Sequence, residues 1–136
     1  MKHIEVVAAV VIANHRILCV QRNKDKYDYI SYKYEFPGGK VEKGETRQQA
    51  LQRELHEELD LDITIEHHFL TVEHMYPDFK ISLHGFICHC DNPKLTLNEH
   101  LQAKWMPVDL IATLDWADAD IPIVDKIIEE AGELEK

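Results

Sequence analysis

Two apolar runs near the start of the chain predict paired strands. Residues 4–12 are almost all β-branched or alanine, and residues 17–20 form a second apolar run after the tripeptide Ala13-Asn14-His15. Continuous apolar runs bounded by turn residues are typical of strands that are buried on both faces. We therefore expect two largely buried strands joined by a tight turn.

A polar segment and a pair of glycines follow these strands. Residues 23–32 are rich in Lys, Asp and Tyr and have no regular period, which predicts a loop over a site. Residues 33–36 predict a short strand that stops at Pro37-Gly38-Gly39. We expect this Pro-Gly-Gly segment to form a turn that leads the chain towards a helix.

The first helix is predicted over residues 47–59. Thr46 offers an N-cap, and Gln49 three residues later completes a capping box. Apolar side chains recur at helical spacing within the segment, at Leu51, Leu55 and Leu59. This stripe predicts an amphipathic helix.

The second half of the chain predicts strands and then helices. The pattern predicts strands over residues 63–74, 81–90 and 103–106, a turn at 76–78, a short helical segment from 107–110 and a final helix over 121–131. This order predicts the α/β class, as an α/β/α sandwich around a mixed central sheet. The length suits a single domain over residues 1–136.

Three carboxylates lie on one face of the predicted helix. At 3.6 residues per turn, Glu54, Glu57 and Glu58 fall within an arc of roughly 100°. Like charges at these spacings repel by a few tenths of a kcal/mol per pair unless a cation or a buried partner neutralises them. The simplest interpretation is a divalent-metal site, and the alternative is an ordinary solvated face.

Charge and composition limit the kinds of molecule that this protein is expected to bind. The formal net charge of −10 argues against binding a nucleic-acid polymer, whose phosphates are held by a basic field. A small phosphorylated substrate stays compatible if metal ions bridge it to carboxylates. The longest apolar run, residues 6–12, is too short for a membrane span, and the first residues lack a signal-peptide core. We expect a cytoplasmic protein with no membrane contact, as a monomer or a homodimer.

The three cysteines predict no disulfide framework. Cys19, Cys88 and Cys90 are an odd number in a chain without a secretion signal, so we expect reduced thiols packed in strands. The nearby His89 points to the opposite face of the strand from residues 88 and 90, which favours core thiols over a zinc site.

The segment around the carboxylates matches a known motif. It reads Gly39, five residues, Glu45, seven residues, then Arg53-Glu54-Leu55-His56-Glu57-Glu58-Leu59-Asp60-Leu61. This resembles the Nudix box, G-x5-E-x7-REUXEEXGU, where U is bulky and aliphatic. Asp60 stands where the pattern has glycine, at a point where left-handed backbone costs Asp about 1 kcal/mol or less. The flanking segments Glu35-Phe36-Pro37-Gly38-Gly39-Lys40 and Trp105-Met106 resemble the MutT branch of this family.

The resemblance implies a Nudix-type hydrolase in which water attacks a phosphorus atom of a metal-bound pyrophosphate. Mg²⁺ is the implied cofactor, with Mn²⁺ as an alternative. Glu57, Glu58 and the carbonyl of Gly38 are implied metal ligands, and Glu54 is implied as a ligand or as the general base. Glu99 lies where MutT-like enzymes present a further carboxylate near the metal.

The remaining candidate residues follow from the same resemblance. Arg53 is expected to pair with Glu45 and hold the loop against the helix. Arg22 and Lys40 are the expected phosphate or ribose contacts. Phe36, Tyr76 and Trp116 could each stack on a base, although packing in the core or at its rim is favoured for each.

The identity of the substrate's base is predicted from a residue at the start of the last predicted helix. Asp120, just before Ile121-Pro122, matches a polar side chain that reads the base in MutT-like proteins, and an ionised Asp only accepts hydrogen bonds. A carboxylate suits N4 of cytosine, although it would also accept from N1 and N2 of guanine. Residues 114–122 resemble the CTP pyrophosphohydrolase branch, which acts on cytidine nucleotides including 5-substituted dCTP.

The expected activity is therefore Mg²⁺-dependent cleavage of a cytidine-type nucleoside triphosphate to the monophosphate and pyrophosphate. A MutT-type 8-oxo-dGTP diphosphatase is the close alternative. A hydrolase of another nucleotide conjugate also stays open, although those relatives often carry longer insertions. A catalytically silent nucleotide-binding module is disfavoured because all three box carboxylates are present.

Overall fold

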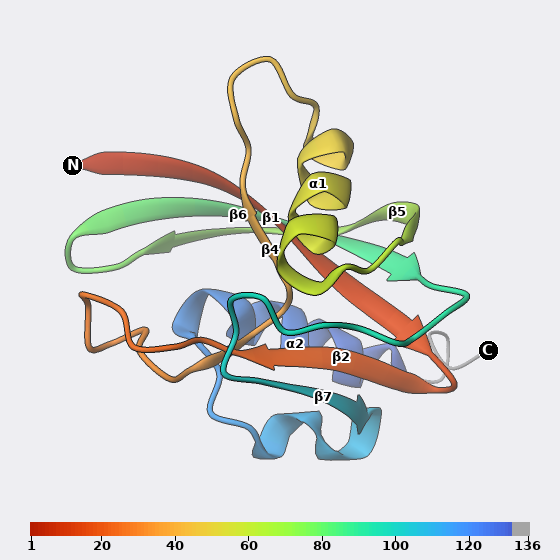
Figure 1. The fold of residues 1–136 in the computed structure, drawn as a ribbon. Helices are drawn as coiled ribbons and strands as arrows, with labels where there is room; N and C mark the ends of the chain where they lie inside the picture. Colours follow the sequence, from red (N-terminus) through yellow and green to blue (C-terminus); the bar gives the residue numbers. More distant parts are fainter. Residues whose placement is uncertain (132–136) are drawn as a thin grey trace.

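The computed structural model describes residues 1–131, and Figure 1 shows their arrangement. The strands are β1 (Lys2–Ala13), β2 (Arg16–Gln21), β3 (Tyr34–Glu35), β4 (Gly38–Lys40), β5 (Thr64–Met75), β6 (Phe79–His89) and β7 (Gln102–Pro107). The helices are α1 (Arg47–Leu59), α2 (Ile121–Glu129) and two short 3-10 helices, η1 (Val108–Thr113) and η2 (Asp118–Asp120).

The strands form one mixed sheet in the order β3-β2-β1-β6-β5, with β4 also paired to β1 and β7 to β2. β1 and β6 run parallel, and the other pairs are antiparallel. The long central pairing of β1 with β6 joins residues 77 positions apart, such as Glu5 and Ser82. The predicted mixed sheet is confirmed.

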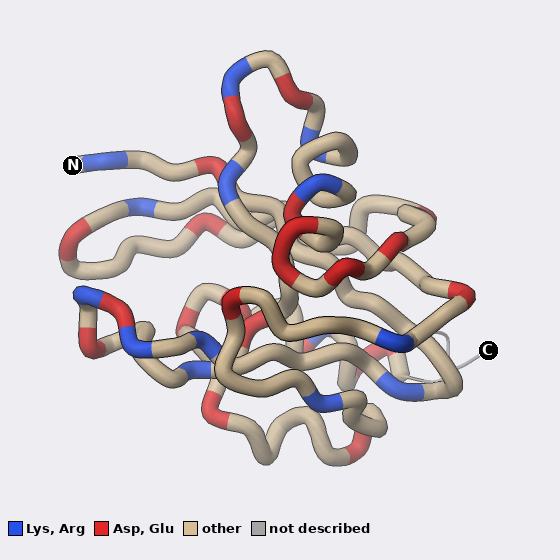
Figure 2. Tube along the Cα trace, in the orientation of Figure 1, with Lys and Arg blue, Asp and Glu red and all other residues tan. Residues whose placement is uncertain are grey.

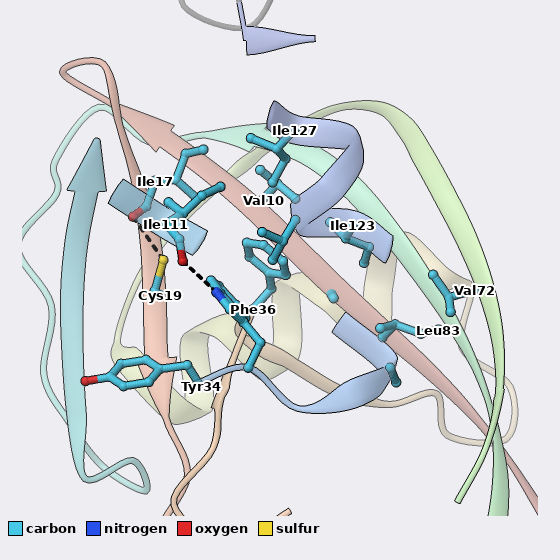
Figure 3. Packing of buried hydrophobic residues seen from close by; sticks show 14 of the residues in the cluster. Val10, Ile17, Cys19, Tyr34, Phe36, Val72, Leu83, Ile111, Ile123 and Ile127 are labelled. Carbon is cyan, nitrogen blue, oxygen red and sulfur yellow. Dashed lines mark hydrogen bonds between the residues drawn. The ribbon is translucent and has the colours of Figure 1, made fainter. Parts of the chain in front are cut away.

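Alternate residues of β1 face two separate apolar layers. Val7, Ala9 and Val11 pack in one cluster with the buried leucines of α1. Ala8 and Val10 belong to the other cluster, which holds the apolar face of α2 and is drawn in Figure 3. The two helices therefore cover opposite faces of the sheet, and the predicted α/β/α sandwich is confirmed (Figure 1).

The capping signals of α1 are confirmed atom by atom. The Thr46 hydroxyl accepts from the Gln49 amide, and the Gln49 side chain accepts from the Thr46 amide. At the other end Asp60 has φ 52°, and its amide donates to the carbonyls of Leu55 and His56. Asp60 thus takes the left-handed conformation that the glycine of the motif would provide.

The expected Pro-Gly-Gly turn is wrong. Gly38 and Gly39 lie in β4, which pairs antiparallel with Val6 to Ala8 of β1. A Cβ atom on Gly38 would stand 1.9 Å from the Val7 carbonyl oxygen, so the strands can approach this closely only with glycine here. The glycine pair allows a close strand contact rather than a reversal of the chain.

The predictions for the turn at residues 76–78 and for the cysteines can be compared with the structure. Residues 76–78 form the connection between β5 and β6, as predicted. All three cysteines are free thiols, with Cys19 and Cys88 buried in strands, whereas Cys90 lies just beyond β6 and is only partly buried. Among the described residues, no helix combines the length and the apolar character needed to cross a bilayer.

The strained end of α1 gives a stability prediction. Asp60→Gly should raise the melting temperature by about 2–4 °C, because glycine adopts left-handed backbone without strain. Asp62→Gly is the matched control, since Asp62 is exposed and does not have a positive φ, and it should lower the melting temperature. Equal shifts in thermal unfolding for the two variants would contradict this explanation.

Candidate active site

The candidate site is a cavity of about 710 Å³ between α1, β4 and the segments that connect β2 to β3 and β5 to β6. One half is lined by the carboxylates of α1 and by Glu99, and Figure 2 shows how acidic positions gather along this helix. The other half is largely apolar and ends at Asp120. The single cavity therefore brings together most of the site residues proposed from the sequence.

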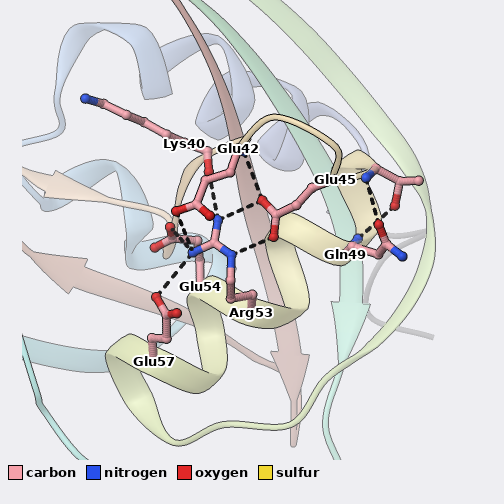
Figure 4. Close-up of polar contacts among 8 residues, drawn as sticks. Lys40, Glu42, Glu45, Gln49, Arg53, Glu54 and Glu57 are labelled. Atoms are coloured by element: carbon pink, nitrogen blue, oxygen red, sulfur yellow. Dashed lines mark hydrogen bonds and ion pairs between the residues drawn. The ribbon is translucent and has the colours of Figure 1, made fainter.

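Arg53 holds the acidic half together, as Figure 4 shows. Its Nε donates to Glu45 at 2.6 Å and its Nη2 donates to the same carboxylate at 2.9 Å, so the expected ion pair is present. Nη1 donates to Glu54 at 2.8 Å and to Glu57 at 3.2 Å. Nη2 also donates to the Lys40 carbonyl, which ties α1 to β4. Arg53 thus neutralises part of the repulsion within the cluster.

Glu58 is the most buried carboxylate of the cluster. Its side chain is enclosed, and Oε1 has no hydrogen-bond partner among the described residues. Burial is the main cause that raises the pKa of Glu58 to about 9, and the charges of Glu54, Glu35 and Glu99 raise it further. A buried carboxylate oxygen without a partner is an unsatisfied group that a cation would satisfy.

The Glu54 side chain lies against Gly39 of β4. A Cβ atom on Gly39 would stand 2.4 Å from the Glu54 carboxyl carbon, so a side chain here would displace the Glu54 carboxylate from its present position. Burial raises the pKa of Glu54, while its contact with Arg53 acts in the opposite direction. Gly39 and Glu54, both fixed positions of the motif, are therefore in close contact, and glycine allows the carboxylate to lie against β4.

Glu99 reaches the cluster because its loop is anchored to the end of α1. The Asn98 amide donates to the Glu58 carbonyl at 3.0 Å, and the Asn98 side chain donates to the Glu57 carbonyl at 2.9 Å. The Thr96 amide donates to the Leu59 carbonyl. These bonds cap the free carbonyls of the helix and hold Glu99 over the same face as Glu54 and Glu58.

The donor set fits a hard divalent cation. The available ligands are carboxylate oxygens and the Gly38 carbonyl, which are the kind that Mg²⁺ and Mn²⁺ prefer, and Mg²⁺ keeps several of its own waters. Within residues 1–131 no group of three or more acidic, His or Cys side chains is arranged as a complete ligand cage. Arg53 pairs with Glu54 and Glu57, and Oε1 of Glu58 is the carboxylate oxygen of the cluster that is buried without a hydrogen-bond partner among these residues.

The apolar half contains the predicted base contacts. Phe36 and Tyr76 are both buried and line the cavity. The Tyr76 hydroxyl accepts from the Ala119 amide at 3.0 Å. Trp116 lies 4.6 Å from Phe36 between ring centres and donates from its indole to the Ile111 carbonyl, in the core rather than at the cavity wall. Core packing, the favoured interpretation for Trp116, agrees with this position.

Asp120 ends the apolar half as a buried acid. Its Oδ2 accepts from the Phe36 amide at 3.0 Å, a contact between residues 84 positions apart. Burial, with the nearby charge of Glu35, raises the pKa of Asp120 well above its usual range. The sequence argument took Asp120 as ionised, whereas this environment shifts the carboxyl towards its neutral form.

The two expected basic contacts differ in their surroundings. Arg22 lines the cavity, but its guanidinium is paired with Asp25 at 2.8 Å and with Glu35 at 3.1 Å. Lys40 is exposed on β4 at the rim of the cavity. Lys40 is thus the more accessible positive charge for a phosphate, while Arg22 is restrained by two carboxylates.

Several lining residues were not foreseen. Glu35 lies between the two halves, where its charge raises the pKa of both Glu58 and Asp120, and it also contacts His100 at 3.2 Å. Tyr27 and Phe79 add aromatic wall to the apolar half. An acidic residue within the apolar stretch before Pro37 was a usable signal for Glu35, whereas nothing local indicated that the two aromatic residues would meet.

The fold and the site define a class: an α/β sandwich with a cluster of carboxylates on one helix that lines a cavity of about 710 Å³. The NUDIX domain family matches residues 1–127, and the chain belongs to the Nudix family. It is a Nudix hydrolase of the MutT type, and such enzymes generally use divalent metals and small nucleotide substrates.

Two characterised relatives and one solved structure illustrate the similarity. The CTP pyrophosphohydrolase of Escherichia coli is 34% identical, covering 92% of this chain and 91% of its own length. The 8-oxo-dGTP diphosphatase of the same organism is 31% identical, covering 93% and 98%. The solution structure of MutT from methicillin-resistant Staphylococcus aureus is 38% identical, covers 96% of this chain and 99% of its own, and has a TM-score of 0.74.

The buried Glu58 gives a pH prediction for the metal-free protein. Its pKa is about 9 in the folded chain against an ordinary 4.5, so between these values the folded state holds a proton that the unfolded chain has lost. Stability should therefore fall as the pH rises from about 5 to about 9. Glu58→Gln should remove much of this fall and raise the melting temperature at pH 8 by roughly 4 °C or more.

The control for this pH series is Glu57→Gln, because the Glu57 side chain is 57% exposed. It should leave the slope of melting temperature against pH close to that of the parent protein. If Glu58→Gln and the parent protein gave the same slope in chelator, burial of Glu58 would not be the cause.

Proposed function

We propose that this protein hydrolyses a cytidine-type nucleoside triphosphate, including 5-substituted dCTP, to the monophosphate and pyrophosphate. The observation that carries the proposal is the one cavity in which the acidic cluster adjoins an apolar recess closed by Asp120. The acidic half suits a metal-bound triphosphate, and the recess suits a base. The free thiols agree with the cytoplasm that we expect as its compartment.

The chain's own groups suit a metal-assisted hydrolysis. Bound divalent cations would neutralise charge on the phosphates and lower the pKa of the attacking water. Glu57, Glu58 and the Gly38 carbonyl would hold them, with Glu99 beside them. Glu54, whose pKa is raised by burial, is our candidate to take the proton from the water, while Arg53 fixes its carboxylate.

A neutral Asp120 matches the cytosine edge. A protonated carboxyl both donates and accepts, whereas an ionised one only accepts. Cytosine presents an acceptor at N3 beside a donor at N4, so the hydroxyl and the carbonyl of the acid can pair with both. The amide of Phe36 fixes the plane of the carboxyl, which supports a directional contact.

An 8-oxo-dGTP diphosphatase is the second candidate. The same neutral carboxyl can donate to O6 and accept from N1 of a guanine base, so Asp120 is compatible with either edge. A cavity of about 710 Å³ has room for a purine as well as a pyrimidine. The choice between the two is thus a question for substrate kinetics.

A panel of natural, 5-methyl and 8-oxo nucleoside triphosphates, with and without Mg²⁺, tests the proposal. We expect Mg²⁺-dependent release of pyrophosphate with the highest kcat/KM for cytidine nucleotides. Glu57→Gln should lower kcat by roughly 100-fold or more, because the removed charge stabilises the metal-bound transition state. Preference for 8-oxo-dGTP would select the second candidate, and a near-normal rate for Glu57→Gln would refute the metal site.

Replacement of Asp120 tests the base contact. Asp120→Asn keeps a donor and an acceptor, so its kcat/KM for the preferred base should stay within about threefold of the parent value. Asp120→Ala should lower that value by roughly 10- to 100-fold, mainly through KM, because a bidentate base contact is lost. Asp118→Ala is the exposed neighbouring control. A loss in kcat that was equal for every base would argue against base reading.

A further inference from the structure

Four aromatic rings close a circuit at the mouth of the apolar recess. Tyr27 and Tyr29 come from the segment between β2 and β3, Tyr76 comes from the β5–β6 connection, and Phe79 is the first residue of β6. The centroid distances are 5.3 Å for Tyr27–Tyr29, 5.4 Å for Tyr29–Tyr76, 5.2 Å for Tyr76–Phe79 and 5.6 Å for Phe79–Tyr27. Each ring therefore contacts two others, and the circuit joins segments about 50 residues apart in the sequence.

One hydrogen bond closes the outer side of this circuit. The Tyr29 hydroxyl donates to Asp78 Oδ2 at 2.8 Å, and Asp78 is exposed at the tip of the β5–β6 connection. Figure 1 shows the two segments next to each other at the same end of the molecule. The bond links the tips of two segments that the sheet does not pair with each other.

The segment between β2 and β3 is braced by hydrogen bonds among its own residues. Ser31 Oγ accepts from the Asp25 amide and donates to the carbonyls of Asp25 and Tyr27. Asp25 also accepts from the Tyr27 amide and pairs with Arg22 at the root of the segment. Because its interior is braced in this way, the segment should respond as a unit when a contact at its tip is removed, although Asn23 also anchors its base by donating to the Glu99 carbonyl.

We propose that Tyr29 and Asp78 form a latch that holds the β2–β3 segment against the β5–β6 connection and so fixes the width of the base-binding recess. Tyr27, Tyr76 and Phe79 line the cavity, whereas Tyr29 stands behind them and acts through them. Tyr76 also accepts from the Ala119 amide, next to Asp120, so the latched wall and the end of the recess form one unit. The inference rests on the proposed function in placing the base in this recess.

The latch makes Tyr29 and Asp78 positioning residues rather than catalytic ones. Within the described residues, neither side chain is hydrogen-bonded to the carboxylate cluster or to Arg53. Asp78 lies on the cavity wall at the apolar end, whereas Tyr29 does not line the cavity. Loss of the latch should widen the recess and weaken the hold on the base. The chemistry at the acidic end should proceed at its usual rate once substrate is bound.

The test uses Tyr29→Phe, Asp78→Ala and the double variant. Tyr29→Phe keeps the ring and removes the hydroxyl, so the core of the circuit is preserved. Tyr32→Phe is the matched control, because Tyr32 lies in the same segment, is 50% exposed and does not line the cavity. Two quantities are measured for each: amide hydrogen exchange over residues 23–32, and KM and kcat for the best nucleoside triphosphate.

Each latch variant should speed exchange over residues 23–32 and raise KM by about 3- to 10-fold, with kcat within about twofold, as loss of one hydrogen bond implies. The double variant should add little to either single change, because both remove the same bond. Unchanged exchange, or faster exchange with an unchanged KM, would overturn the latch. An inactive parent protein across the nucleotide panel would instead count against the proposed function, and the exchange data would still judge the segment contact.

Discussion

The crowding of carboxylates on one face of α1 is the constraint on which the site depends. Glu54, Glu57 and Glu58 are held together by the guanidinium of Arg53 and by burial that favours the protonated form of Glu58. Neither of these satisfies the cluster completely, because Oε1 of Glu58 is buried and has no hydrogen-bond partner among the described residues. A divalent cation, as proposed for this site, would give that oxygen a partner and would offset the repulsion between the carboxylates.

Two close contacts of β4, one with β1 and one with α1, connect the carboxylate cluster to the sheet. Gly38 lies against the Val7 carbonyl, and Gly39 lies against the Glu54 carboxyl. β4 therefore lies between β1 on one side and α1 on the other. A side chain at Gly38 would force β4 away from β1, because the clash is with backbone atoms, whereas a side chain at Gly39 would displace the Glu54 carboxylate.

The sequence predicted what depends on nearby residues. The capping box of Thr46 and Gln49 and the left-handed Asp60 are local signals, and both are confirmed. The Gly38-Gly39 pair was assigned to a turn because the two residues were considered alone, whereas their role depends on β1, about 30 residues earlier. The role of Glu35 and the Tyr29–Asp78 contact were not predicted for the same reason, since these residues meet their partners only in the folded protein.

Glu35 connects the two halves of the cavity. Its charge raises the pKa of Glu58 at the acidic end and of Asp120 at the apolar end, and it is held by Arg22 and His100. The two ends therefore lie in one electrostatic field, although they serve different parts of a substrate. Glu35 is only partly buried, yet it lies close enough to both Glu58 and Asp120 to affect the pKa of each. If a cation binds at the acidic end as proposed, it would therefore also change the electrostatic environment of Asp120, because Glu35 interacts with both ends of the cavity.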